Sequence, residues 1–127
     1  MAESKKYEVA VSAVPQYIAE QSDPVRDNYV FAYTITIENV GTVPAQLISR
    51  HWIITDAGGE VQEVRGLGVV GRQPLLQPGE KFVYTSGCQI DTPVGTMRGS
   101  YQLTAVDGRQ FEAEIPAFTL AVPHVLH

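Results

Sequence analysis

A strict alternation of residue types over residues 28–38 constrains the fold of this chain more than any other feature. Large apolar side chains occupy every second position from 31 to 37, at Phe31, Tyr33, Ile35 and Ile37. β-Branched and aromatic residues dominate the stretch, as a half-buried pleated strand requires. A period of two indicates a strand, and no window of the chain shows the i, i+3, i+4, i+7 apolar spacing of an amphipathic helix. The sequence therefore predicts an all-β protein.

Turn signals divide the rest of the chain into further short strands. We expect strands at residues 7–13, 45–56, 60–64, 81–86 and 97–106, and a last one from 109 to 122. Asp107-Gly108 is predicted to join two adjacent antiparallel strands, because Asp-Gly between alternating runs is a strong hairpin signal. Pro116 interrupts the last run, which should continue as an edge strand or after a bulge. Seven or eight such strands predict a two-sheet antiparallel sandwich of the immunoglobulin or fibronectin-III type.

Trp52 is the candidate core residue between the two sheets. We expect Ile48 and Ile54 to lie on the same face of its strand. A ligand-stacking role for Trp52 is the alternative, but burial is the more common fate of a mid-strand tryptophan.

Length and composition indicate one domain spanning residues 1–127, with residues 1–6 and 124–127 as flexible ends. The only cysteine is Cys88, which excludes a disulfide framework and fits a reducing, cytoplasmic compartment. The polar N-terminus lacks the apolar core of a signal peptide, and no apolar run is long enough to span a membrane. A net charge of −5 argues against a nucleic-acid partner.

A glycine-rich segment is the clearest candidate binding site. Gly66, Gly68 and Gly71 form a G-x-G-x-x-G pattern, with Arg65 and Arg72 on either side and no acidic residue between positions 64 and 79. A dinucleotide fingerprint needs a helix after the glycines, and the turn signals that follow leave no room for one. The backbone N–H groups of the glycine-rich segment, from Gly66 to Gly71, would instead form a nest for phosphate, and the two arginines would close over it. Alternatively, the glycines serve backbone geometry alone and the arginines keep the loop soluble.

Eight short segments together resemble the ApaG family: residues 29–39, 49–56, 66–71, 73–74, 78–80, 84–87, 97–101 and 115–118. The resemblance as a whole covers nearly the entire chain, from about Tyr7 to Pro123. One departure is Arg72, where the family pattern leads us to expect an acidic residue. The resemblance implies a fibronectin-III-like sandwich without a settled activity. It also implies an association with divalent-cation efflux, of cobalt or magnesium, and with diadenosine polyphosphate metabolism, and use of the domain as an interaction or sensing module.

Candidate catalytic groups are few. Cys88 has no charged neighbour in sequence, His51 lies mid-strand, and His124 and His127 lie in the C-terminal tail. None is paired with the base or orienting group that covalent catalysis needs. The acidic residues are scattered along the chain, so we expect no metal site and no cofactor. We therefore expect no catalytic residue and no enzymatic activity.

Three functions follow from these observations. The first is a protein-interaction module with an unidentified protein partner. The second is a sensor of phosphate, pyrophosphate or a nucleotide that uses the loop from Arg65 to Arg72. The third is a phosphoanhydride hydrolase, which ranks last because the loop has no accompanying base or carboxylate cluster.

Overall fold

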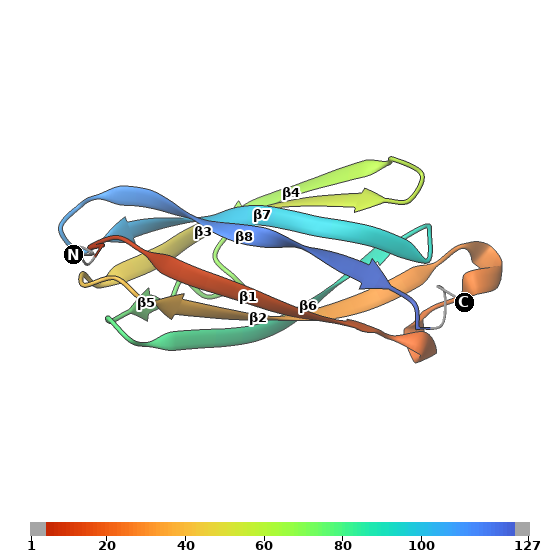
Figure 1. The fold of residues 1–127 in the computed structure, drawn as a ribbon, viewed down its shortest axis with the longest axis horizontal. Helices are drawn as coiled ribbons and strands as arrows, with labels where there is room; N and C mark the ends of the chain where they lie inside the picture. The colour runs from red at the N-terminus through yellow and green to blue at the C-terminus, as the bar shows by residue number, and fades with distance from the viewer. Residues whose placement is uncertain (1–4, 124–127) are drawn as a thin grey trace.

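The computed structural model describes residues 5–123 and arranges them in two antiparallel β-sheets packed face to face (Figure 1). The three-stranded sheet has the order β1-β2-β6, with bounds Val9–Tyr17, Tyr29–Asn39 and Lys81–Ile90. The other sheet has the order β4-β3-β7-β8, with bounds Val61–Leu67, Ala45–Asp56, Val94–Ala105 and Gln110–Ala121. A two-residue strand, β5 (Leu75–Leu76), pairs with β3. The predicted all-β sandwich is confirmed.

Two short 3-10 helices, η1 (Ala19–Gln21) and η2 (Pro24–Arg26), lie in the loop between β1 and β2. No helix among residues 5–123 is long and apolar enough to cross a membrane. The carbonyl of Lys6 accepts hydrogen bonds from the backbone N–H groups of Thr42 and Val43, so the chain is held by the sandwich from Lys6 onward. The expectation of flexible ends otherwise falls on residues 1–4 and 124–127, which lie outside the described part of the chain.

The alternation in β2 builds the core as predicted. All four alternating residues are at most 6% exposed (Phe31, Tyr33, Ile35 and Ile37). Trp52 of β3 is 2% exposed, and its ring centroid lies 5.3 Å from that of Tyr33 and 6.0 Å from that of Phe118. Trp52 therefore joins the two sheets as expected.

Two β-bulges change which side chains face this core. The register of β3 against β7 shifts between Leu47 and Ser49, which makes Ile48 the extra residue. Leu47 and Trp52 are both buried although their numbers differ in parity, while Ile48 is only partly buried. The prediction that Ile48 shares a face with Trp52 is wrong, because a bulge flips every later side chain to the other face.

The second bulge lies on β8. Met97 pairs with Phe118 and Gly99 with Ile115, so two residues of β8 lie opposite one residue of β7. The extra length falls at Pro116, where a missing N–H makes a regular ladder impossible. β8 is also an edge of its sheet, so both parts of the expectation for Pro116 are confirmed.

The Asp107-Gly108 turn joins β7 to β8 as predicted, but its loop is one residue longer than the two that Asp-Gly suggested. Ala105 N–H donates to the carbonyl of Arg109, and Gly108 N–H donates to that of Ala105. Gly108 has φ +93°. This is a three-residue loop, a tight turn followed by a left-handed glycine. Strands β4 and β6 are also longer than predicted, and the extension of β4 includes part of the glycine motif.

Candidate functional site: an inter-sheet groove beside the glycine loop

The glycine motif is half strand and half turn. Gly66 belongs to β4, and the chain turns at Val70-Gly71, where φ is +44° and +78°. Val69 N–H donates to the Arg72 carbonyl at 2.8 Å, and Arg72 N–H donates to the Val69 carbonyl at 2.9 Å. Positive φ at both central residues is the geometry of a two-residue hairpin turn. No helix follows the glycines up to residue 123, as the sequence predicted.

The predicted anion nest is only partly available in this turn. The N–H groups of Gly68 and Val69 already donate to backbone carbonyls, Gly68 to that of Ile48 at 2.8 Å. Val70 and Gly71 retain N–H groups that bond to no backbone carbonyl within residues 5–123. Anion binding by this loop stays a prediction, with those two groups as its remaining donors.

The two arginines of the motif do not close over the turn. The Arg65 guanidinium lies 3.0 Å from a carboxylate oxygen of Glu63 in the same strand. The Arg72 guanidinium lies over the ring of Phe82, 5.7 Å from its centroid. The structure therefore separates both side chains from the glycines they were expected to serve.

Arg50 occupies the position beside the glycine turn that we expected Arg65 and Arg72 to fill. Its Nη1 donates to the carbonyls of Leu67 and Gly68, each at 2.9 Å. A Cβ on Gly66 would lie 2.8 Å from Nη2 and 2.9 Å from Cζ, so the absence of a side chain there makes room for the guanidinium. No described carboxylate lies within 4 Å of it. Arg50 was missed although its position, two before Trp52 in one strand, puts it on the core-facing side.

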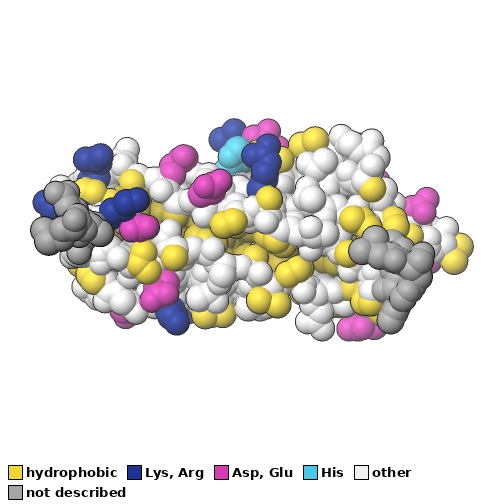
Figure 2. All heavy atoms as spheres, in the orientation of Figure 1, with side chains coloured by type: hydrophobic (Ala, Val, Ile, Leu, Met, Phe, Trp, Pro, Cys, Tyr) yellow, Lys and Arg dark blue, Asp and Glu magenta, His cyan; other side chains and the backbone are white. Residues whose placement is uncertain are grey.

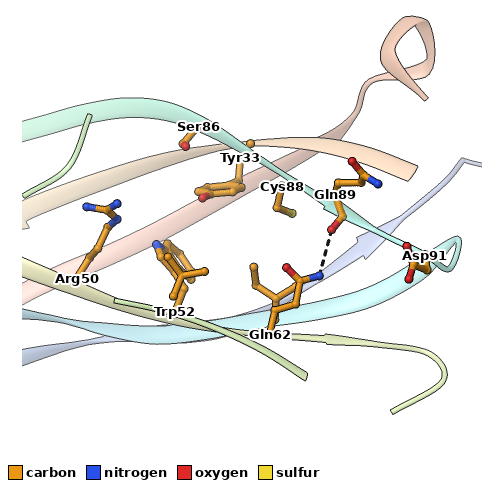
Figure 3. A pocket seen from close by; sticks show the side chains of 11 residues that line it. Tyr33, Arg50, Trp52, Gln62, Ser86, Cys88, Gln89 and Asp91 are labelled. Carbon is orange, nitrogen blue, oxygen red and sulfur yellow. Dashed lines mark hydrogen bonds between the residues drawn. The ribbon is translucent and has the colours of Figure 1, made fainter. Parts of the chain in front are cut away.

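A groove opens between the sheets where β4 and β6 are the neighbouring edges (Figure 3). It encloses about 490 Å³. Trp52 and Tyr33 line it from β3 and β2, together with residues of β4 and β6 that include Gln62, Val64, Ser86, Cys88 and Gln89. A second hollow of about 250 Å³ continues past Arg50 to the glycine turn. Arg50, Tyr33, Trp52 and Ser86 line both hollows, so Arg50 stands at the junction.

Buried tyrosine hydroxyls and one partly buried thiol lie near this junction in their neutral forms. The Tyr84 and Tyr101 hydroxyls share a hydrogen bond of 2.5 Å. Burial raises the pKa of Tyr84 to about 12, and that of Tyr101 further. Burial likewise raises the pKa of Tyr33 and brings that of Cys88 to about 11. Since a thiolate is the reactive form, Cys88 is a poor nucleophile at neutral pH.

His51 lies on the outer face of the same sheet, among basic and acidic side chains at the surface (Figure 2). Its Nε2 lies 2.5 Å from a carboxylate oxygen of Glu63, which also meets Arg65. The His51 hydrogen bond, with the Arg65 charge next, holds the pKa of Glu63 below its usual value. The His51 side chain is 20% exposed, and no hydroxyl or thiol of residues 5–123 bonds to its ring. His124 and His127 lie outside the described residues.

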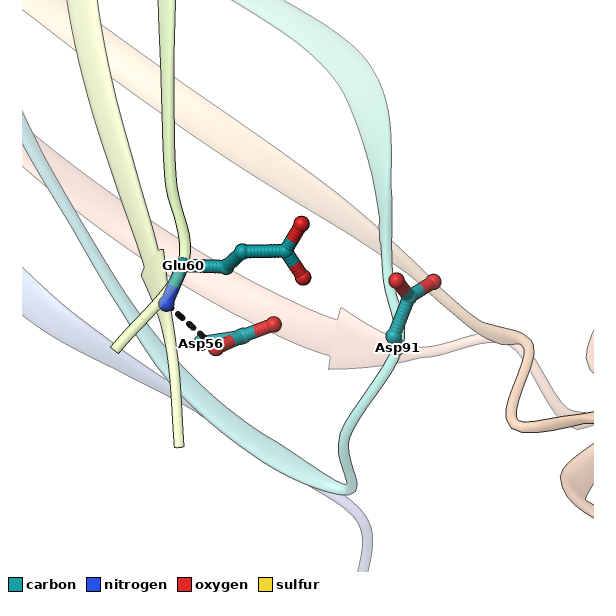
Figure 4. A group of neighbouring side chains, drawn as sticks. All are labelled: Asp56, Glu60 and Asp91. Carbon is teal, nitrogen blue, oxygen red and sulfur yellow. Dashed lines mark hydrogen bonds between the residues drawn. The ribbon is translucent and has the colours of Figure 1, made fainter. Parts of the chain in front are cut away.

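The tertiary structure gathers three acidic residues that the sequence shows as scattered. One carboxylate oxygen each from Asp56, Glu60 and Asp91 lies within 4.8 Å of the others (Figure 4). Asp56 Oδ1 already accepts the N–H groups of Gly58 and Glu60, each at 2.9 Å. The sequence gives no sign of this cluster because Asp91 comes from a separate turn, and the expectation of no metal site stays a prediction. Asp91 also lines the far end of the groove.

Comparison with known proteins gives concordant matches over the whole chain. An ApaG domain model matches residues 19–105. Proteins described as ApaG from Thiobacillus denitrificans and Dechloromonas aromatica are 70% and 65% identical over the full length of both chains. A crystal structure described as the putative ApaA protein from Bordetella pertussis is 58% identical, with a TM-score of 0.93 over 97% of this chain and 100% of that one. The chain belongs to the ApaG family.

Proposed function

We propose that this protein is a non-enzymatic interaction module that receives an extended segment of a partner protein in the groove between β4 and β6. The proposal rests on two strand edges, those of β4 and β6, which pair with no further strand of residues 5–123 and lie beside an open groove of about 490 Å³. Free edges present unpaired N–H and C=O groups, which an added strand satisfies.

One side chain already donates a hydrogen bond to the backbone at the β6 edge, as an added strand would. Gln62 Nε2 donates to the backbone carbonyl of Gln89 at 3.3 Å, a long bond that an incoming backbone N–H would replace (Figure 3). Trp52 and Tyr33 line the floor of the groove, where they are 2% and 6% exposed. Aromatic side chains recur at the centres of protein interfaces.

The chemistry of the described residues supports binding over catalysis. The Cys88 thiol is neutral at physiological pH, and His51 is held by Glu63 on the outer face, away from the groove. The cation-efflux association that the family resemblance implies would then rest on a partner protein. Phosphate sensing by the glycine turn is the second candidate, favoured by the free N–H groups of Val70 and Gly71. The hydrolase ranks last.

Phage display of random peptides on the full-length protein tests the proposal. Val64 lines the groove and is 38% exposed, whereas Val83 is 56% exposed and alternates with the core-facing residues of β6. Val64→Lys should weaken selected peptides at least about tenfold, and Val83→Lys, with the same added charge, should not. Bound peptide should also slow alkylation of Cys88. Peptides that bind Val64→Lys undiminished, or a selection that enriches none, would refute the groove.

A further inference from the structure

We infer that Arg50 recognises an acidic side chain within the extended segment that occupies the groove. The inference deepens the proposed function and rests on it. The proposed ligand is a side-chain carboxylate of the bound peptide. The group that recognises it is the edge of the Arg50 guanidinium formed by Nε and Nη2.

The Arg50 guanidinium is held in place, but only part of its hydrogen-bond donors are used within residues 5–123. Both protons of Nη1 are used by the carbonyls of Leu67 and Gly68, and the plane rests against Gly66. Within residues 5–123 no group accepts a hydrogen bond from Nε or Nη2. These two atoms form one edge of the guanidinium and donate in parallel, which matches the two oxygens of a carboxylate. The contacts at Nη1 hold this edge in place before a ligand arrives.

The surroundings of Arg50 strengthen a charged contact. Figure 3 shows Arg50, Tyr33 and Ser86 extending into the same end of the groove. Trp52 beneath is 2% exposed, and burial is the main cause of the raised pKa of Tyr33. In such a partly desolvated setting an ion pair is screened less than at an open surface.

The charge balance favours a carboxylate over a phosphate. Arg50 is the only cation among the described residues that line the two hollows, and Asp91 adds a negative charge at the far end. One guanidinium matches the single charge of a carboxylate. A phosphate dianion or pyrophosphate usually needs more cations or several backbone N–H groups.

The position of Arg50 favours an internal residue of the segment over its terminus. About 490 Å³ of groove lies toward Asp91 and about 250 Å³ toward Gly71. A chain that places a carboxylate at Arg50 therefore finds room to continue in both directions. A terminal carboxylate would leave one hollow empty.

Synthetic peptide pools test the inference. Three fluorescent pools share randomised flanks and carry glutamate, glutamine or phosphoserine at the central position. On the wild-type protein the glutamate pool should bind roughly tenfold tighter than the glutamine pool, as a charge-assisted pair implies. Arg50→Gln should erase that preference. Arg65→Gln removes the same charge from the outer face, where Arg65 pairs with Glu63, and should preserve it.

Arg50→Gln also removes the Nη1 hydrogen bonds and so disturbs the glycine turn. A second measurement, made on the wild-type protein, therefore accompanies the variant. The Nε–H resonance of Arg50 should shift downfield when a peptide from the glutamate pool binds. Equal binding of the glutamate and glutamine pools, or a preference that survives Arg50→Gln, overturns the inference. If Val64→Lys still abolishes that equal binding, the groove itself stands. If the phosphoserine pool binds most tightly, the ligand of Arg50 is a phosphate and not a carboxylate. If no pool binds, both the groove and the role of Arg50 are refuted.

Discussion

Val70 offers a sharp test of the backbone geometry of the glycine turn. It has φ +44°, a left-handed conformation that β-branched residues avoid because their side chains crowd the backbone. Asparagine tolerates this region, and Asn-Gly is the preferred pair for a turn with two positive φ angles. Val70→Asn should therefore stabilise the protein.

The magnitude follows from the strain and the exposure of the side chain. A left-handed conformation costs an ordinary residue roughly 1–2 kcal/mol, which asparagine largely escapes. The Val70 side chain is 54% exposed, so its removal forfeits only part of a valine's burial energy. The net gain should be about 1 kcal/mol, which for a domain of this size raises Tm by about 4 °C.

Urea unfolding followed by Trp52 fluorescence measures this gain. The matched control is Val61→Asn, at a 61% exposed position in β4 with ordinary strand geometry. That change should lower stability slightly, because asparagine is a poor strand residue. Equal destabilisation by both substitutions would refute the strain at Val70.

Three further predictions concern the core, the glycines and alkaline pH. Trp52→Ala should lower the free energy of unfolding by about 3–5 kcal/mol, and ready iodide quenching of the native tryptophan would contradict its burial. Gly66→Ala should leave the fold intact but displace the Arg50 guanidinium, whereas Gly68→Ala, with φ +65° and a Cβ 2.4 Å from a backbone carbonyl, should destabilise strongly; urea midpoints compare the two. Burial raises the pKa of Cys88 from 9.0 to about 11, so the unfolded thiol ionises first and stability falls as the pH rises between these values. Cys88→Ala should reduce that slope, and an unchanged slope in unfolding experiments would show that the thiol ionises equally in both states.

The strands were readable from the sequence because alternation is a local property. The bounds predicted for β3, residues 45–56, are those observed, and the core face of β2 follows from its pattern alone. The bulge at Pro116 was readable for the same reason, since proline lacks the N–H that a regular ladder uses. The bulge at Ile48 was not, because no residue in β3 itself signals that its partner β7 is one residue short.

The candidate site depends on pairings between distant parts of the chain. The glycine motif is visible in the sequence, but the neighbours of its arginines, Glu63 and Phe82, are decided by strand direction and cross-sheet packing. Arg50 reaches the turn only because β3 and β4 pair antiparallel.

The groove and the acidic cluster arise in the same way, from β4 and β6 lying opposite each other and from two turns that meet at one end. The sequence by itself determined which segments are strands and which of their faces are apolar. The tertiary structure alone decided which side chains meet, because backbone preference acts over a few residues whereas contacts across sheets join residues far apart in the chain.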